Sequence, residues 1–257
     1  MTFTVENLEF YLLVLVRVSA LVMTAPFFSY NSVPVRVRAA MSVFLSLVLI
    51  PIIPVIDLNY AGVVGYSVLI LKETLIGFTL GFMCNMCFFI VSFSGQLMDM
   101  EMGLSMASMF DPMTNTQISV TGNIYNYLLM LMMVVTNMHY YIVRAIADSF
   151  TYFNIGKAIF PIADIKNLVV DFIGSYFIIG FRIILPVFCC MLLINVVLGV
   201  LAKAAPQMNM FVIGLQIKVL VGLIVLVLIL QSSPMVADYI FDEMKEVITN
   251  VIHVFTP

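Results

Sequence analysis

Long apolar runs alternate with short polar connections along most of the chain. A run of roughly 20 apolar residues is long enough to cross the hydrocarbon core of a membrane as a helix. Six runs near or above this length lie at 10–28, 38–56, 66–93, 123–143, 171–201 and 209–230. The pattern predicts an all-α, integral-membrane-type helical protein of about six long apolar helices.

Prolines fall within or beside several of these runs. A proline removes a backbone N–H donor, and a membrane helix tolerates this loss where neighbouring protein or a cavity satisfies the freed carbonyl. The residues concerned are Pro26, Pro51, Pro54 and Pro186. We therefore expect several of the helices to be broken.

The connection at 94–122 is rich in methionine. Five of its methionines are spaced to fall on one face of a helix, and they are Met98, Met102, Met106, Met109 and Met113. Gly103 should interrupt this helix, and Asp111-Pro112 should end it, because the residue before a proline is pushed out of the α region. The thioethers either fill an irregular core or form a soft surface that repacks around different partners.

The C-terminal third predicts a helical hairpin followed by an amphipathic tail. Two apolar runs flank a turn at 203–211, and the segment 238–255 then combines an apolar face with an acidic one. A helix with one acidic face is expected to meet water or a partner protein rather than the hydrocarbon core.

Composition supports a membrane environment. The chain has 257 residues, 63% of them hydrophobic and 10% charged, whereas soluble domains carry roughly 25% charged residues. The net charge of −3 and the scattered Lys and Arg residues argue against a nucleic-acid partner. The first nine residues contain Glu6 and Glu9 and no basic stretch, so we expect no cleavable signal peptide. Loop Lys and Arg residues give no clear membrane orientation.

Catalytic and cofactor chemistry is not expected. The sequence shows no carboxylate pair, metal-ligand cluster or nucleophile constellation. The four cysteines, Cys84, Cys87, Cys189 and Cys190, all lie in apolar runs. We expect them to be small buried side chains rather than redox or metal groups.

Ionisable residues inside the apolar runs need partners. Each would cost about 3 kcal/mol or more if it faced lipid, and they are Arg17, Lys72, Glu73, Arg182 and Lys218. An ion pair within the chain, an inter-subunit contact and a polar conduit are the alternatives. Arg36 and Arg38, beside Pro34, are expected to contact carboxylates of a neighbouring subunit rather than lipid headgroups.

Four blocks, spread in order over essentially the whole chain, resemble the FliR/SctT family of type III secretion export-gate proteins, the flagellar branch in particular. The blocks are LVRVSALVMTAPFFSYNSVPVRVRAAMSVFLSLVLIP (15–51), GFTLGFMCNMCFFIVSFSGQLMDMEMGLSMASMFDP (77–112), NMHYYIVRAIADSF (137–150) and AKAAPQMNMFVIGLQIKV (202–219). The resemblance implies a non-enzymatic subunit of the flagellar export gate, without cofactors. It also implies assembly with FliP, FliQ and FlhB into a channel for unfolded flagellar proteins, in the flagellar basal body at the bacterial inner (cytoplasmic) membrane, with several membrane passes.

The resemblance also implies a division of the chain. Residues 1–170 are similar to FliP and include a plug loop at about 94–122, while residues 171–257 are similar to FliQ and comprise the hairpin and the tail. The hairpin turn falls at Pro206, Gln207 and Asn209. In the family the plug projects into the channel, and the matching residues here are Gly103, Leu104, Met106, Met109, Phe110, Asp111, Pro112 and Met113.

Two alternatives remain at this stage. The first is the injectisome branch of the same family, of the SctT type, over which only the segments 31–38 and 111–122 favour the flagellar branch. Intramembrane charges and proline-broken helices are also typical of a small-solute secondary transporter, although no repeat pairs the two halves of this sequence.

Overall fold

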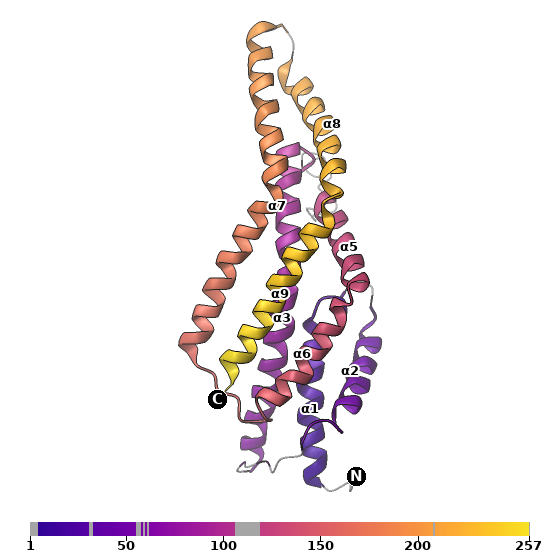
Figure 1. The fold of residues 1–257 in the computed structure, drawn as a ribbon, viewed down its shortest axis with the longest axis vertical. Helices are drawn as coiled ribbons and strands as arrows, with labels where there is room; N and C mark the ends of the chain where they lie inside the picture. The colour runs from indigo at the N-terminus through magenta and orange to yellow at the C-terminus, as the bar shows by residue number, and fades with distance from the viewer. Residues whose placement is uncertain are drawn as a thin grey trace. The chain divides into compact units, whose positions relative to one another are not determined.

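The structure, a computed structural model, describes residues 5–30, 33–54, 58, 60, 62–105, 119–207 and 209–256. Over these residues it is all-helical, which confirms the predicted fold class (Figure 1). The helices are α1 (Val5–Thr24), α2 (Val35–Leu49), α3 (Gly62–Met102), α5 (Val120–Val135), α6 (Met138–Tyr152), α7 (Ile162–Ala204), α8 (Met210–Leu230) and α9 (Ser233–Phe255).

The chain forms two compact units. Unit 1 comprises Met1–Cys87, Thr136–Ile173 and Asp242–Pro257, and unit 2 comprises Phe88–Val135 and Gly174–Phe241. Because α3, α7 and α9 each contribute residues to both units, the units are discontinuous in sequence. The predicted division near residue 170 concerns similarity to FliP and FliQ rather than compactness, and it stays a prediction.

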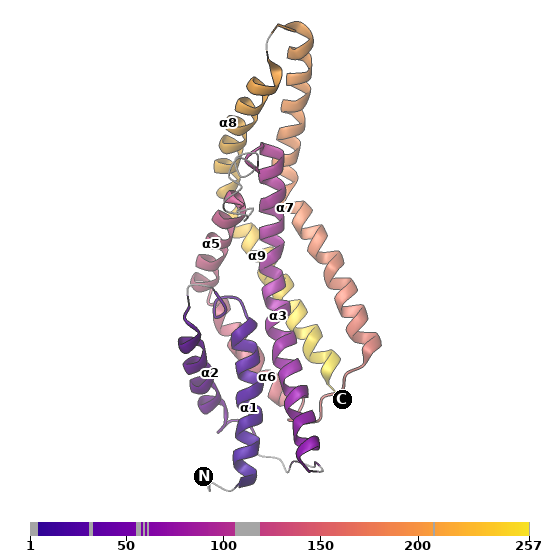
Figure 2. The same ribbon diagram turned by 180° about the vertical axis from the view of Figure 1, so that it is seen from behind.

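The core of unit 1 is built on α1, the first part of α3, α6 and the end of α9. The helix α1 is apolar on most of its faces, so neighbours can cover it on several sides. Almost fully buried side chains here include Phe10, Leu13, Val14, Val18, Val22, Ile76, Leu80, Ile142, Ile146 and Val251. Within this unit α1 and α2 lie side by side in both views (Figures 1 and 2).

The core of unit 2 contains two of the five methionines that were predicted to share one helix face. Met98 and Met102, on the last turns of α3, are both 0% exposed. Met102 lies against α8 at Gly222, where an added Cβ would come within 2.6 Å of the Met102 Cγ. These two thioethers therefore fill a core, as flexible side chains do. The other three methionines of the stripe lie outside the described residues.

The hairpin predicted for the C-terminal third is present in unit 2. The second part of α7 and α8 run beside each other and are joined by a short turn (Figure 1). Gly214 of α8 faces Leu198 of α7, whose side chain would be 3.4 Å from an added Cβ. The predicted amphipathic tail is the helix α9, with Met244, Val247 and Val251 buried.

Three of the described helices are long and apolar enough to cross a membrane. They are α3, α7 and residues Val212–Leu230 of α8, and the bent pair α5 and α6 makes a fourth if it counts as one span. The prediction of a membrane-length helix at 38–56 is wrong, because α2 has 15 residues and ends at Leu49. Pro51 follows two residues later, where the chain cannot continue a regular helix.

Other helix boundaries also differ from the prediction. The helix α3 runs on to Met102, so the first part of the expected connection at 94–122 is helical. The run at 123–143 is divided between α5 and α6, because Asn137 adopts a left-handed conformation with φ of 59°. Of the four prolines expected to break helices, Pro186 lies inside a helix, whereas Pro26, Pro51 and Pro54 lie outside the helices.

The cysteines do not all follow the prediction. Cys84 and Cys87 are buried in α3, as expected. Cys189 is exposed on α7, and Cys190 is half-buried. Much of the apolar surface of α7 is likewise left uncovered by the described residues, since only 22% of its most apolar stretch is buried. The expectation of burial fails at Cys189 because the described residues of this chain leave that face of α7 uncovered.

Candidate functional site

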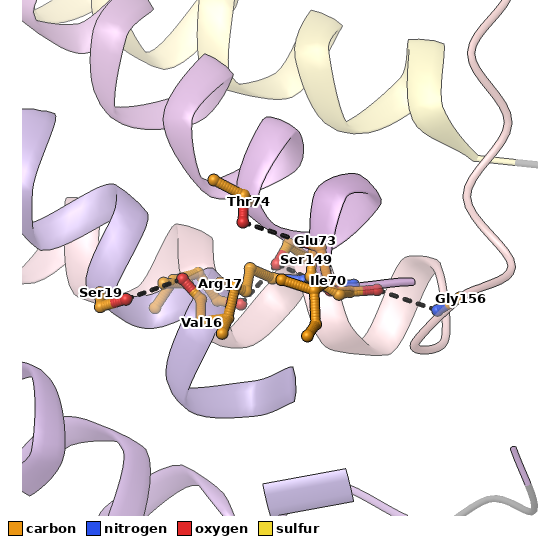
Figure 3. Close-up of polar contacts among 9 residues, drawn as sticks. Val16, Arg17, Ser19, Ile70, Glu73, Thr74, Ser149 and Gly156 are labelled. Carbon is orange, nitrogen blue, oxygen red and sulfur yellow. Dashed lines mark hydrogen bonds and ion pairs between the residues drawn. The ribbon is translucent and has the colours of Figure 1, made fainter. Parts of the chain in front are cut away.

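Two charged residues meet in the core of unit 1. Arg17, on α1, and Glu73, on α3, are both 0% exposed, and the Arg17 Nε lies 2.6 Å from a Glu73 carboxylate oxygen. Figure 3 shows the two side chains pointing toward each other from their helices. The pair thus joins two helices whose charged residues are 56 positions apart in the sequence.

Neighbouring groups bind the second oxygen of Glu73 and one further nitrogen of Arg17. The second carboxylate oxygen of Glu73 accepts a bond of 2.9 Å from the backbone N–H of Gly156 (Figure 3). Arg17 Nη1 donates to the Ser149 hydroxyl at 3.2 Å. Arg17 Nη2 is buried without a hydrogen-bond partner among the described residues, but the guanidinium lies 4.1 Å from the centre of the Phe150 ring. Such a contact stabilises a desolvated cation.

A close approach of α1 and α3 makes this pairing possible. A Cβ added to Gly77 would lie 2.2 Å from the backbone oxygen of Arg17, and one added to Gly81 would lie 2.1 Å from the Thr24 hydroxyl oxygen. Small residues four positions apart let helix backbones come together. The GxxxG spacing of α3 therefore packs helices within this chain.

The arrangement is suited to holding helices rather than to chemistry on a substrate. A buried ion pair balances its own charges, and its acid and base are closed off from solvent. Together Arg17, Glu73, Ser149 and Gly156 join α1, α3, α6 and the segment after α6. We call this set the unit 1 polar cluster.

The other charged residues that were predicted to need partners lie outside the unit 1 polar cluster. Arg36 is exposed, and Arg38 donates to the carbonyls of Tyr30 and Val33. Lys72 and Lys218 are half-buried. In unit 2, Arg182 is exposed on α7, and its guanidinium lies 5.2 Å from the centre of the Tyr239 ring. Contacts of these residues with neighbouring subunits stay predictions.

The predicted plug is described only at its start. Gly103 ends α3 with φ of +80°, a left-handed conformation that glycine adopts readily, and Leu104 is half-buried. The interruption predicted at Gly103 is thus present. The remaining plug residues lie outside the described residues, and they are Met106, Met109, Phe110, Asp111, Pro112 and Met113.

The predicted hairpin turn lies between α7 and α8. Pro206 and Gln207 are exposed in the turn. The carbonyl of Asn209 accepts a 3.2 Å bond from the N–H of Ile213, so Asn209 stands at the start of α8.

Sequence reasoning missed the partners of the predicted charges. Ser149, Phe150 and Gly156 contribute to the unit 1 polar cluster, yet each is a common residue with no diagnostic spacing to Arg17. It also missed Asp99, which is 4% exposed on α3 in unit 2 and bonds to Ser119 and Thr121. The available signal was an acidic residue in the connection at 94–122, with a serine just before the next apolar run.

A known protein family and several known proteins match nearly the whole chain. The family described as bacterial export proteins, family 1, matches residues 8–244. The flagellar biosynthetic protein FliR of Pectobacterium carotovorum subsp. carotovorum is 32% identical over 238 residues, which cover 92% of this chain and 90% of that protein. FliR of Bacillus subtilis (strain 168) is 30% identical over 247 residues, 94% of each chain. FliR of Escherichia coli (strain K12) is 29% identical over 246 residues, 95% of this chain and 93% of that protein. This chain therefore belongs to the bacterial export proteins of family 1.

Proposed function

We propose that the chain is a non-catalytic core subunit of the flagellar type III export gate, in the bacterial inner membrane at the flagellar basal body. The observation that carries the proposal is its similarity, over about nine-tenths of its length, to proteins named as flagellar biosynthetic protein FliR. In the proposed complex it forms a channel with FliP-like, FliQ-like and FlhB-like subunits, and unfolded flagellar proteins pass through.

The uncovered surface of α7 supports assembly with other subunits. Arg182 is exposed there beside exposed apolar residues such as Phe181 and Leu185. A guanidinium at the centre of a span costs about 3 kcal/mol or more in lipid. A protein neighbour that offers polar groups would remove this cost, and it would also cover the apolar side chains.

The segment that follows Gly103 is proposed to close the channel as a plug. Residues 103–118 match the position of the plug in the family, and the soft side chains of Met106, Met109 and Met113 suit a closure that reforms after each passenger. We also propose that the chain is divided into a FliP-like part, residues 1–170, and a FliQ-like part, residues 171–257.

A secondary transporter is the weaker candidate. Its argument from sequence used Arg17, Lys72, Glu73 and Arg182 as possible substrate or ion ligands. Arg17 and Glu73 bind each other in a closed core, so half of that set is occupied within the chain.

Deletion of the gene in its own organism tests the proposal. The mutant cells should make flagellar subunits and retain them, and a copy of the gene should restore their export. A copy carrying Arg144→Ala, which breaks only the exposed ion pair with Asp148, should restore export equally. Normal flagellar export by the deletion strain would refute the proposal, and loss of effector secretion instead would assign the chain to an injectisome.

A further inference from the structure

One side of the first part of α3, within unit 1, exposes apolar residues at regular intervals. They are spaced alternately by four and three positions, as on a single helix face, and each is between 41% and 77% exposed. The residues are Val64, Val68, Leu71, Leu75, Phe78 and Phe82. The rings of Phe78 and Phe82 are stacked, with their centroids 5.4 Å apart. We call these six residues the α3 seam.

The opposite side of the same helix is the side that packs in the core of unit 1. Glu73, Ile76 and Leu80 are each at most 1% exposed. Between residues 75 and 82, the exposed residues of α3 all belong to the seam. The stripe left uncovered is therefore narrow, and a single helix is wide enough to cover it.

The polar residues beside the seam differ in how far their needs are met. The hydroxyls of Ser67, Thr74 and Thr79 donate to backbone carbonyls four positions earlier in the helix, at 3.0, 2.8 and 2.7 Å. Lys72 makes no ion pair with any residue that the structure describes. The adjacent carboxylate of Glu73 is already bound by Arg17 and Gly156. A carboxylate for Lys72 must therefore come from outside the described residues.

Lipid is an unfavourable cover for the seam because of where Lys72 lies. At about 1.5 Å per residue the seam is about 27 Å long, close to the ~30 Å thickness of a hydrocarbon core. Lys72 lies near its middle, since it follows Val64 by eight positions and precedes Phe82 by ten. A bilayer that covered the seam would place the ammonium group near its centre, where a charge is costly and the interface is out of reach.

Water and a second copy of this chain are also unfavourable. In water the seam would leave a continuous strip of large apolar side chains uncovered, and such strips are typical of binding surfaces. Two identical seams that overlap fully about a two-fold axis would set Lys72 against Lys72, and like charges across an interface repel each other. The partner is therefore expected to be a different chain.

We propose that the α3 seam binds an apolar helix of another subunit of the export gate, and that a carboxylate of this helix pairs with Lys72. The inference rests on the proposed function, because it requires a complex with other subunits. It adds the surface of this chain that the neighbour covers and the charge that the neighbour carries.

Photo-cross-linking in the complete complex tests the inference. The photoreactive analogue benzoylphenylalanine should be placed at position 82, where the parent has an exposed phenylalanine, so folding is not at risk. After irradiation of membranes that contain all the subunits, mass spectrometry should find the link in an apolar helix of another subunit. An acidic residue should lie about ten positions from the linked residue, which is the separation of Lys72 from Phe82. Links to lipid alone, or between two copies of this chain, would overturn the inference.

Reversal of the charge tests the ion pair. Lys72→Glu would set two negative charges against each other, and the yield of purified complex should fall at least tenfold. Lys157→Glu makes the same change at an exposed position outside the helices of unit 1 and should leave the yield at the parental value. Changing the linked subunit's acidic residue to lysine should restore the yield of Lys72→Glu, which a misfolded variant could not show. Equal yields from Lys72→Glu and Lys157→Glu, or no restoration, would refute the pairing.

The parental complex separates this inference from the proposed function. If the chain is purified without FliP-like or FliQ-like subunits, the proposed function itself fails. If the complex is purified and the probe at position 82 reacts only with lipid, the proposed function stands and the role of the α3 seam is refuted.

Discussion

Arg17 and Glu73 neutralise each other in the core of unit 1, with the Arg17 Nε 2.6 Å from a carboxylate oxygen and both side chains fully buried. Removal of one member of a buried pair leaves a charge without compensation, which costs about 3–5 kcal/mol. Glu73→Gln should therefore sharply lower the apparent melting temperature and the yield of folded protein in detergent.

An exposed pair in the same unit provides the control. Arg144 lies 3.8 Å from Asp148, and the two side chains are 78% and 47% exposed. Pairs of this kind contribute about 0–1 kcal/mol, so Arg144→Ala should melt close to the parent. Equal destabilisation by Arg144→Ala and Glu73→Gln would contradict the importance given to burial.

The coupling within the pair is a separate prediction. In Arg17→Met combined with Glu73→Gln, neither side chain carries a charge, so no lone charge stays buried. Residues in direct contact show coupling of about 0.5–3 kcal/mol, and the double variant should lose less stability than the sum of the two single variants. Strictly additive losses, measured by melting of the three purified variants, would show that the two residues act independently.

Gly95 is predicted to tolerate no side chain. An added Cβ would meet the backbone of Gly122 at 2.2 Å, and backbone atoms cannot move aside as a flexible side chain can. Gly95→Ala should separate α3 from α5 and cost at least about 1–3 kcal/mol, the usual range for overpacking. Melting and folded yield measure the effect.

Gly174 is the matched control for this substitution. It lies within α7, and no atom of the described residues is within 4 Å of an added Cβ. Gly174→Ala should leave stability unchanged or raise it by about 0.5–1 kcal/mol, because alanine favours the helix. Comparable losses at both glycines would show that close packing is not the cause.

Substitutions at the neighbouring residues Lys72 and Glu73 should distinguish an effect on assembly from an effect on folding. Glu73 is buried in the unit 1 polar cluster, whereas Lys72 is half-buried. If Lys72 meets a neighbouring subunit, Lys72→Ala should lower the yield of the purified complex while the melting temperature of the chain stays at the parental value. A normal complex yield from Lys72→Ala would remove this inter-subunit contact.

The sequence identified charges that need partners, but it could not identify the partners. The cost of a charge in an apolar run marks Arg17 and Glu73 from the sequence alone. Their pairing joins positions 56 residues apart, and no local periodicity carries that information. The additional bond from Gly156 depends on where the chain turns after α6, which is also a tertiary property.

Helix ends were predictable where a backbone requirement decides them. The positive φ at Gly103 ends α3 at the position where an interruption was predicted; the end predicted at Asp111-Pro112 lies outside the described residues. The unbroken run of α3 to Met102 was missed, because the methionine spacing was interpreted as a separate short helix within the connection at 94–122. Burial of the Asp99 carboxylate against Ser119 and Thr121 satisfies it, and the helix can therefore continue.

The chain's dependence on partner subunits tests the central claim most directly. The chain should be expressed with and without the proposed FliP-like and FliQ-like partners. The membranes should then be solubilised in detergent, and the mass of the purified particle should be measured. Membership of an export gate predicts a stable particle that contains these partners and aggregation of the chain without them. A chain that is stable and monodisperse alone, and that binds neither partner, would contradict the account.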